Sequence, residues 1–233
     1  DRTRCAEGDP EACLDVARNA ADGEAGDEDV ALAVGALGRA CETGLGRACT
    51  VLGVVHGNSP HPPAEPGQAL SFFELGCERG DGEGCLVAGY AYAEDDIVPT
   101  DLGRAARFWE RACEAGSGEG CTQAGWLRFE GWGPLRDKAA AVAWLRRGCV
   151  DLRFEIACGR LAVLSTFGLV PDVDSATARA WGEAACAARD PESCTAFPPV
   201  APEVTPRNCQ GVGTSVTPGH TTPGTRRTLG TRK

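Results

Sequence analysis

Residues 113–121 read Cys-Glu-Ala-Gly-Ser-Gly-Glu-Gly-Cys, and stretches bounded by cysteines in this way recur along the whole chain. Most of these cysteine pairs enclose seven residues, and one pair encloses eight. The first cysteines of successive pairs stand 36 residues apart, with one extra residue before the last pair. Such a fixed period is typical of a solenoid, in which each repeat packs only on its neighbours. The pairs are Cys5 and Cys13, Cys41 and Cys49, Cys77 and Cys85, Cys113 and Cys121, Cys149 and Cys158, and Cys186 and Cys194.

Each period has the sequence features of two helices joined by a loop. Segments 85–93 and 121–131 predict first helices, and 101–113 and 137–149 predict second helices, because apolar residues recur at three- and four-residue spacing. An acidic residue precedes each second helix and suits an N-cap or a first turn. No sustained period-two run predicts a sheet, so we expect an all-α fold. The acidic residues are Asp29, Glu65, Asp101, Asp137 and Asp174.

Small and bulky residues keep the same period. Helices that stack in an array must approach closely, and a small side chain four positions after each second cysteine permits this. Bulky residues four or five positions before a cysteine should then fill the space between helices, and a cofactor site built from them is the less favoured alternative. The small residues are Ala17, Gly53, Gly89, Gly125 and Ala162, and the bulky ones are Phe72, Phe73, Phe108, Trp109, Trp144, Leu145 and Trp181.

The cysteine pairs predict disulfides. The first cysteine ends one helix and the second begins the next, which brings the two Cα atoms within about 4.4–6.8 Å. Zinc is the alternative, but structural zinc sites favour cysteines two to four residues apart, and the chain has only three histidines, His56, His61 and His220. We therefore expect no metal and no other cofactor. Disulfides on this scale require an oxidising compartment, so a periplasmic, outer-membrane-anchored or secreted bacterial protein is predicted.

Charge and composition disfavour some classes of partner and indicate where the domain ends. The net charge of -10 disfavours nucleic acid and anionic lipid, and no apolar stretch approaches a membrane span. The chain has no methionine, so we expect a processed product or a fragment. Residues 1–197 should form the solenoid, of about five repeats, and the Pro-, Thr-, Gly- and Arg-rich residues 198–233 a disordered tail. Cys209 in that tail is predicted to be a free thiol or to form an intermolecular disulfide.

Three stretches of one period carry a resemblance to a known family. They are Gly84-Cys-Leu-Val-Ala-Gly-Tyr-Ala-Tyr92, Val98-Pro-Thr-Asp-Leu-Gly-Arg-Ala105 and Phe108-Trp-Glu-Arg-Ala-Cys113. With them the chain resembles the Sel1-like repeat family over about residues 5–194, and within it the cysteine-rich secreted proteins first known from Helicobacter. The resemblance implies a right-handed superhelix of helix pairs, like tetratricopeptide arrays, with a disulfide between consecutive repeats. The stretch 149–158 departs from the pattern because it has no glycine and one extra residue.

The expected function is a non-enzymatic one. Some cysteine-rich members of this family are described as β-lactam-binding hydrolases with weak β-lactamase activity, which stays the alternative. The chain has only Lys138 and Lys233 and completes neither the Ser-x-x-Lys nor the Lys-Thr-Gly motif of such enzymes, so no catalytic residue is predicted. A solenoid offers its concave face to proteins or peptides, which predicts an extracytoplasmic scaffold or adaptor with a protein partner. Candidate groove residues are His56, Tyr90, Tyr92, Trp126, Phe129 and Trp132; inter-repeat packing or a rigid spacer without a ligand are the other interpretations of the same residues.

Overall fold

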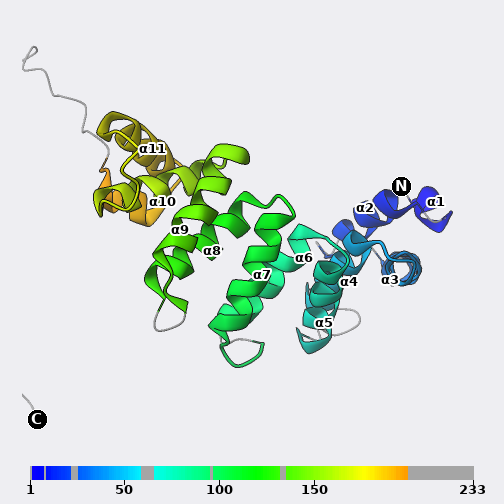
Figure 1. The fold of residues 1–233 in the computed structure, drawn as a ribbon. Coiled ribbons are helices and arrows are strands. Elements are labelled where there is room, and N and C mark those ends of the chain that lie inside the picture. Colours follow the sequence, from blue (N-terminus) through cyan, green and yellow to red (C-terminus); the bar gives the residue numbers. More distant parts are fainter. Residues whose placement is uncertain are drawn as a thin grey trace, which may run out of the picture. The chain divides into compact units, whose positions relative to one another are not determined.

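The structure is a computed structural model of the chain, and it describes residues 2–7, 9–21, 26–58, 66–94, 97–131 and 135–198. These residues form helices joined by turns, with no strand among them (Figure 1), which confirms the expected all-α fold. The helices are α1 (Arg2–Ala6), α2 (Pro10–Ala21), α3 (Asp27–Glu42), α4 (Gly46–Asn58), α5 (Pro66–Glu78), α6 (Gly82–Ala93), α7 (Leu102–Glu114), α8 (Gly118–Glu130), α9 (Lys138–Arg146), the π-helix η2 (Arg147–Asp151), α10 (Glu155–Thr166), α11 (Ser175–Ala187) and α12 (Pro191–Ala196). All of them belong to one compact unit, residues 1–199.

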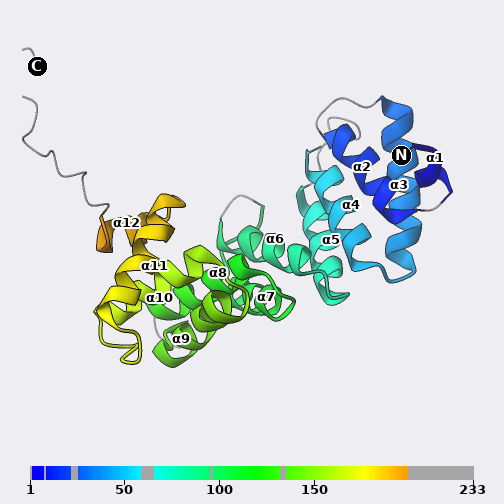
Figure 2. The same cartoon turned by 90° about the horizontal axis from the view of Figure 1, so that it is seen from above.

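The helices stack in chain order as repeated pairs. Each helix packs on the next one along the chain, as α4 and α5 do in Figure 2. The first helices of neighbouring pairs also touch, so that α4 contacts α6, α6 contacts α8, α8 contacts α10 and α10 contacts α12. The apolar core follows the same order, as consecutive clusters shared by neighbouring pairs. These contacts are those of a helix-pair solenoid, as the 36-residue period predicts.

The acidic residues before the second helices act as predicted. The carboxylates of Asp101, Asp137 and Asp174 accept hydrogen bonds from backbone N–H groups in the first turns of α7, α9 and α11, and so cap these helices. Asp29 lies in the first turn of α3, after the N-cap Gly26, which is the other predicted placement. Glu65 lies outside the described residues. The first helices have caps of their own, which the sequence analysis did not identify: Asp81, Ser117 and Asp190.

Six disulfides join the cysteine pairs that the spacing predicts. Their Cα–Cα distances lie between 4.4 and 4.8 Å, because each bridge connects the last turn of one helix to the first turn of the next. The turn inside a bridge needs one residue with positive φ. Glycine supplies it at Gly44, Gly80 and Gly116, whereas Arg153 and Arg189 adopt φ of 54° and 68° in the last two bridges. A non-glycine residue in this conformation is strained.

The bridge between Cys149 and Cys158 differs from its sequence prediction in one respect. The second helix was expected to run to Cys149, but α9 ends at Arg146 and the chain continues as the π-helix η2. The extra residue of this stretch is accommodated by the wider turn of a π-helix, which is how single-residue insertions commonly enter a helix. The disulfide Cys149–Cys158 is therefore kept despite the insertion.

The small residues of the first helices lie where bulky side chains of the second helices pack. A Cβ atom on Gly53 would lie 2.5 Å from the Phe73 ring, and one on Gly89 would lie 2.4 Å from the Trp109 ring. Phe73, Trp109 and Leu145 are buried as predicted. The bulky residues one position earlier, and Trp181, are only half-buried, because successive residues point about 100° apart on a helix. Each second helix therefore presents one row of buried bulky residues and, beside it, one row of half-buried bulky residues at the edge of the core.

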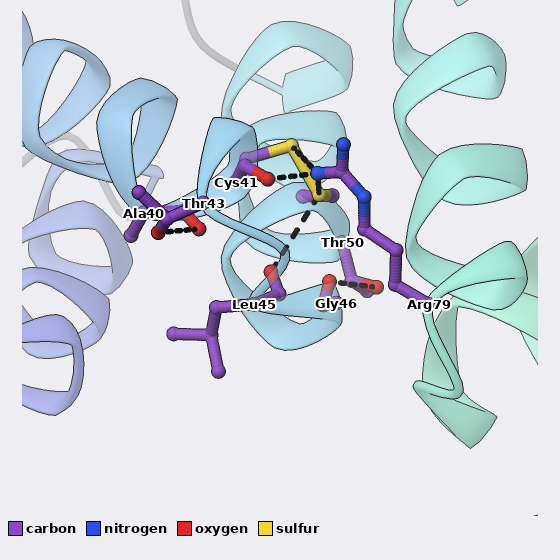
Figure 3. The surroundings of a disulfide bond; sticks show 8 residues. Ala40, Cys41, Thr43, Leu45, Gly46, Thr50 and Arg79 are labelled. Carbon is purple, nitrogen blue, oxygen red and sulfur yellow. Dashed lines mark hydrogen bonds between the residues drawn. A yellow bond between two sulfur atoms is a disulfide. The ribbon is translucent and has the colours of Figure 1, made fainter.

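Arginine side chains tie neighbouring repeats together beside the disulfides. Arg79 lies next to the Cys41–Cys49 bridge (Figure 3), where its guanidinium donates to the Cys41 carbonyl and lies 2.9 Å from the Cys49 sulfur. Arg111 donates to the Cys77 carbonyl at 2.9 Å, and Arg147 donates to the Glu114 carbonyl at 3.2 Å. The Cys41 and Cys77 carbonyls also accept hydrogen bonds from the Gly44 and Gly80 N–H groups of the turns, so the arginines add a second hydrogen bond at the ends of these helices.

Candidate functional site

Half-buried polar and aromatic side chains gather where successive first helices meet. In α6, α8 and α10 they occupy the second or fifth position after the second cysteine, where they contact residues of a neighbouring first helix while Tyr90 and Trp126 also pack against the core. We call this surface the first-helix face and define it by Tyr90 of α6, Gln123 and Trp126 of α8, and Arg160 of α10. Two of the predicted groove residues, Tyr90 and Trp126, belong to it.

Tyr90 connects α6 to the start of α8. Its hydroxyl donates a hydrogen bond of 2.6 Å to the Glu119 carboxylate and accepts one of 2.5 Å from the Gln123 amide. Its ring meets the buried Trp109 ring edge-on at 5.4 Å. Burial, followed by the hydrogen bond to Glu119, raises the pKa of Tyr90 to about 12. The hydroxyl therefore stays a neutral donor at physiological pH and fixes one edge of the face.

Trp126 forms the centre of the second polar cluster. The Arg160 guanidinium lies 4.2 Å from the centre of the Trp126 ring, in a cation–π contact. The same guanidinium donates to the Asp190 carboxylate at 2.8 Å and pairs with Glu192. The Asp190 side chain is only 2% exposed and also caps α12 through the Ser193 backbone N–H. Arg160 thus holds α8, α10 and α12 together.

An apolar groove of about 350 Å³ opens beside this cluster, between the ends of α8 and α10 and helix α12. Phe129 lies 5.3 Å from Trp126 and 5.5 Å from Phe167, measured between ring centres. Phe167, at the end of α10, is 62% exposed and is the most exposed large apolar side chain of the described residues. The three rings form a continuous aromatic wall. Phe129 was predicted from the sequence, whereas Phe167 was not.

The remaining predicted groove residues lie elsewhere. Tyr92 is buried, with its ring stacked on Phe108 and its hydroxyl donating to Glu74 at 2.6 Å. One period later Arg128 pairs with Glu110 in the same manner, at 2.5 Å. This position therefore binds the preceding second helix, so Tyr92 does not belong to the first-helix face, and its role in a ligand groove stays a prediction.

Two further predicted groove residues are His56 and Trp132. His56 is half-buried and stacks on Phe72 of α5, with ring centres 5.2 Å apart, so it too faces a second helix. Trp132 and Cys209 lie outside the described residues.

The twelve paired cysteines have their sulfurs in disulfides, so none of them offers a thiolate to a metal. Within the described ranges, no group of three or more His, Cys, Asp or Glu residues is placed to hold a metal ion, and no helix there is long and apolar enough to cross a membrane.

The stacked helix pairs define a helical-repeat protein. The sequence model of the Sel1 repeat matches residues 46–81, 83–117, 118–149 and 156–190, which is more than half of the chain, and the chain therefore belongs to the Sel1 repeat family. Proteins of this family generally act as scaffolds for protein interactions. The pair α2 and α3 lies before the matched residues, yet it packs and carries a disulfide like the others.

Solved structures share the fold. A protective antigen present in uropathogenic Escherichia coli strains and displaying an SLR fold superposes with a TM-score of 0.63 at 25% identity, over 82% of this chain and 41% of that one. The chain thus spans less than half the length of that antigen. A Sel1 repeat protein from Oxalobacter formigenes superposes with a TM-score of 0.61 at 20% identity, over 80% of this chain and 76% of that one. A search of curated protein sequences finds no significant match.

Proposed function

We propose that the protein is an extracytoplasmic scaffold that binds a protein or peptide through the first-helix face, the surface that corresponds to the concave side of such arrays. The observation that carries this proposal is the row formed by Tyr90, Trp126 and their polar neighbours. Tyrosine, tryptophan and arginine are the residues most enriched among binding hot spots, and here they stand half-buried at the edge of the core on neighbouring first helices.

The polar groups of the face are arranged to hold it rigid before a ligand arrives. Tyr90 is fixed by Glu119 and Gln123, and Trp126 is fixed by Arg160. Rigid side chains lose little conformational entropy on binding, so a preorganised face favours affinity. The disulfides support the same conclusion, because each one fixes the start of a first helix and thereby the spacing of the residues that follow it.

The test is selection of peptides from a displayed random library on the immobilised, oxidised full chain. Peptides that bind the first-helix face should lose at least about tenfold in affinity for Trp126→Ala, since truncating an aromatic hot spot has an effect of this size. Trp144→Ala is the matched control, because Trp144 is also a half-buried tryptophan but lies on the second helix α9. Equal binding to both variants, or selection of no peptide at all, would refute the proposal.

The proposed compartment and the alternative activity have separate tests. An oxidising environment outside the cytoplasm is supported by the six disulfides. Thiol titration of denatured, unreduced protein should then find about one thiol per chain, which leaves only the thirteenth cysteine unpaired. A dozen titratable thiols would contradict it. The β-lactam-binding alternative predicts sustained nitrocefin turnover by the pure protein, whereas the scaffold proposal predicts none.

A further inference from the structure

The groove lined by Trp126, Phe129 and Phe167 exposes apolar surface. Phe129 and Phe167 line it together with Val163, and the Phe167 ring remains 62% exposed. Large apolar side chains gathered on one surface are typical of interaction sites, whereas single exposed ones are common. The volume of about 350 Å³ lies at the small end of ligand pockets and fits one or two side chains of a peptide.

The charges around the groove are mostly negative. Glu130 and Glu192 contribute to its lining, and none of the described residues that line it is a lysine or an arginine. The nearby Arg160 is shared between Asp190 and Glu192, so that this cluster has one positive and two negative groups. The groove therefore combines an apolar floor with an acidic rim.

We propose that this groove binds a cationic peptide segment that carries one bulky apolar side chain. The apolar side chain lies against Phe129 and Phe167, and lysine or arginine residues on either side of it face Glu130 and Glu192. The proposal rests on the proposed function of the first-helix face and adds to it the chemical class of the ligand and the position of its anchor. Apolar burial supplies the affinity, and charge complementarity supplies the selection against acidic peptides.

Three fluorescein-labelled nonapeptides test the ligand class by anisotropy on the oxidised full chain. The first is Gly-Lys-Gly-Lys-Phe-Lys-Gly-Lys-Gly, the second replaces every Lys with Glu, and the third replaces Phe with Ala. The first peptide should bind at least about tenfold more tightly than either of the others. Its affinity should also fall between about 50 mM and about 500 mM salt, because exposed charges are screened. Equal binding of the acidic peptide would overturn the proposal.

Variants of exposed residues locate the site. Phe167→Ala should lower the affinity for the Lys–Phe peptide about tenfold, and Glu130→Gln about threefold, with unchanged far-UV circular dichroism. Val150→Ala is the control, because Val150 is 57% exposed on η2 and does not line the groove. An affinity unaffected by Phe167→Ala would also overturn the proposal.

The outcome separates this inference from the proposed function. If the selected library peptides depend on Trp126 but are acidic or lack an apolar anchor, the ligand class is wrong and the face still binds peptides. If neither the library nor the designed peptides bind, both proposals are wrong.

Discussion

Gly89 is the position where the packing of the array is most directly testable. A Cβ atom there would lie 2.4 Å from two atoms of the Trp109 ring, which is only 6% exposed and is also contacted edge-on by Tyr90. Gly89→Ala gains about 1 kcal/mol from helix propensity. It also forces an overpacked contact that costs about 1–3 kcal/mol, and because the ring is rigid and enclosed we expect a cost near the upper end. The net effect is a destabilisation of about 1–2 kcal/mol.

Urea unfolding of the oxidised protein, followed by circular dichroism, measures this effect. With a slope near 3 kcal/mol/M, the midpoint should fall by about 0.5 M. Gly38→Ala is the matched control, because Gly38 lies inside α3 and a Cβ atom there would have nothing within 4 Å. That variant should be more stable than the parent by about 0.5–1 kcal/mol. If both variants shift the midpoint upward, the close approach of the two helices at Gly89 is refuted.

Three other changes have predictable results. Replacing Cys113 and Cys121 together by serine should lower the free energy of unfolding by about 2.5 kcal/mol, the chain-entropy value for a nine-residue loop, and an unchanged urea midpoint would contradict the stapling role. Arg189→Gly should raise it by about 0.5–1 kcal/mol, since φ is 68° there; a lower thermal midpoint would show that the arginine side chain matters more than the backbone. The hydrogen bond from Arg146 lowers the pKa of Asp172 to about 2, so the stabilisation by this pair is complete above pH ~4 and is lost as the pH falls through about 2. Carboxyl NMR titration of Arg146→Leu should raise that pKa toward about 3.9, and no change would rule out the pair as its cause.

The repeat period predicted those features that depend on one residue and its near neighbours. A cap needs only an acidic residue and the three that follow it, so Asp101 and Asp137 were identified correctly from the sequence. A disulfide between adjacent helix ends needs only the loop length, so the pairing Cys113–Cys121 was also accessible. Each of these features depends on residues that are close together in the sequence, so it recurs with the sequence repeat.

The direction in which a half-buried side chain points was not accessible in this way. Tyr90 and Tyr92 are both tyrosines on one helix, but they stand about 200° apart around its axis. Tyr90 meets Glu119 of the next first helix, whereas Tyr92 meets Glu74 of the preceding second helix. The sequence did contain a signal for the direction of Tyr92. One period later Arg128 stands in its position and Glu110 in that of Glu74, and the opposite charges of this pair indicate a contact.

The Arg160 cluster was missed for a different reason. The single-residue insertion before Cys158 interrupts the 36-residue period. Counted from the second cysteine, Arg160 stands in the position of Gln123, but its partners Asp190 and Glu192 lie 30 or more residues further along the chain, which local spacing does not predict. Phe167 lies directly after α10, where repeat patterns vary most. The groove therefore forms where the regular period is broken, which is why regularity alone did not reveal it.

The disulfides and the first-helix face are parts of one arrangement. Glu119, the acceptor for Tyr90, stands two residues before Cys121, and the bridge to Cys113 fixes this first turn of α8. Trp126 stands five residues after Cys121 on the same helix, about 7.5 Å along its axis. Reduction of the bridge frees the turn that positions Glu119 while leaving the hydrogen bonds inside α8 intact. The helix can therefore persist in the reduced chain, so we expect the proposed peptide binding by the face to depend on the oxidised state more strongly than helix content does.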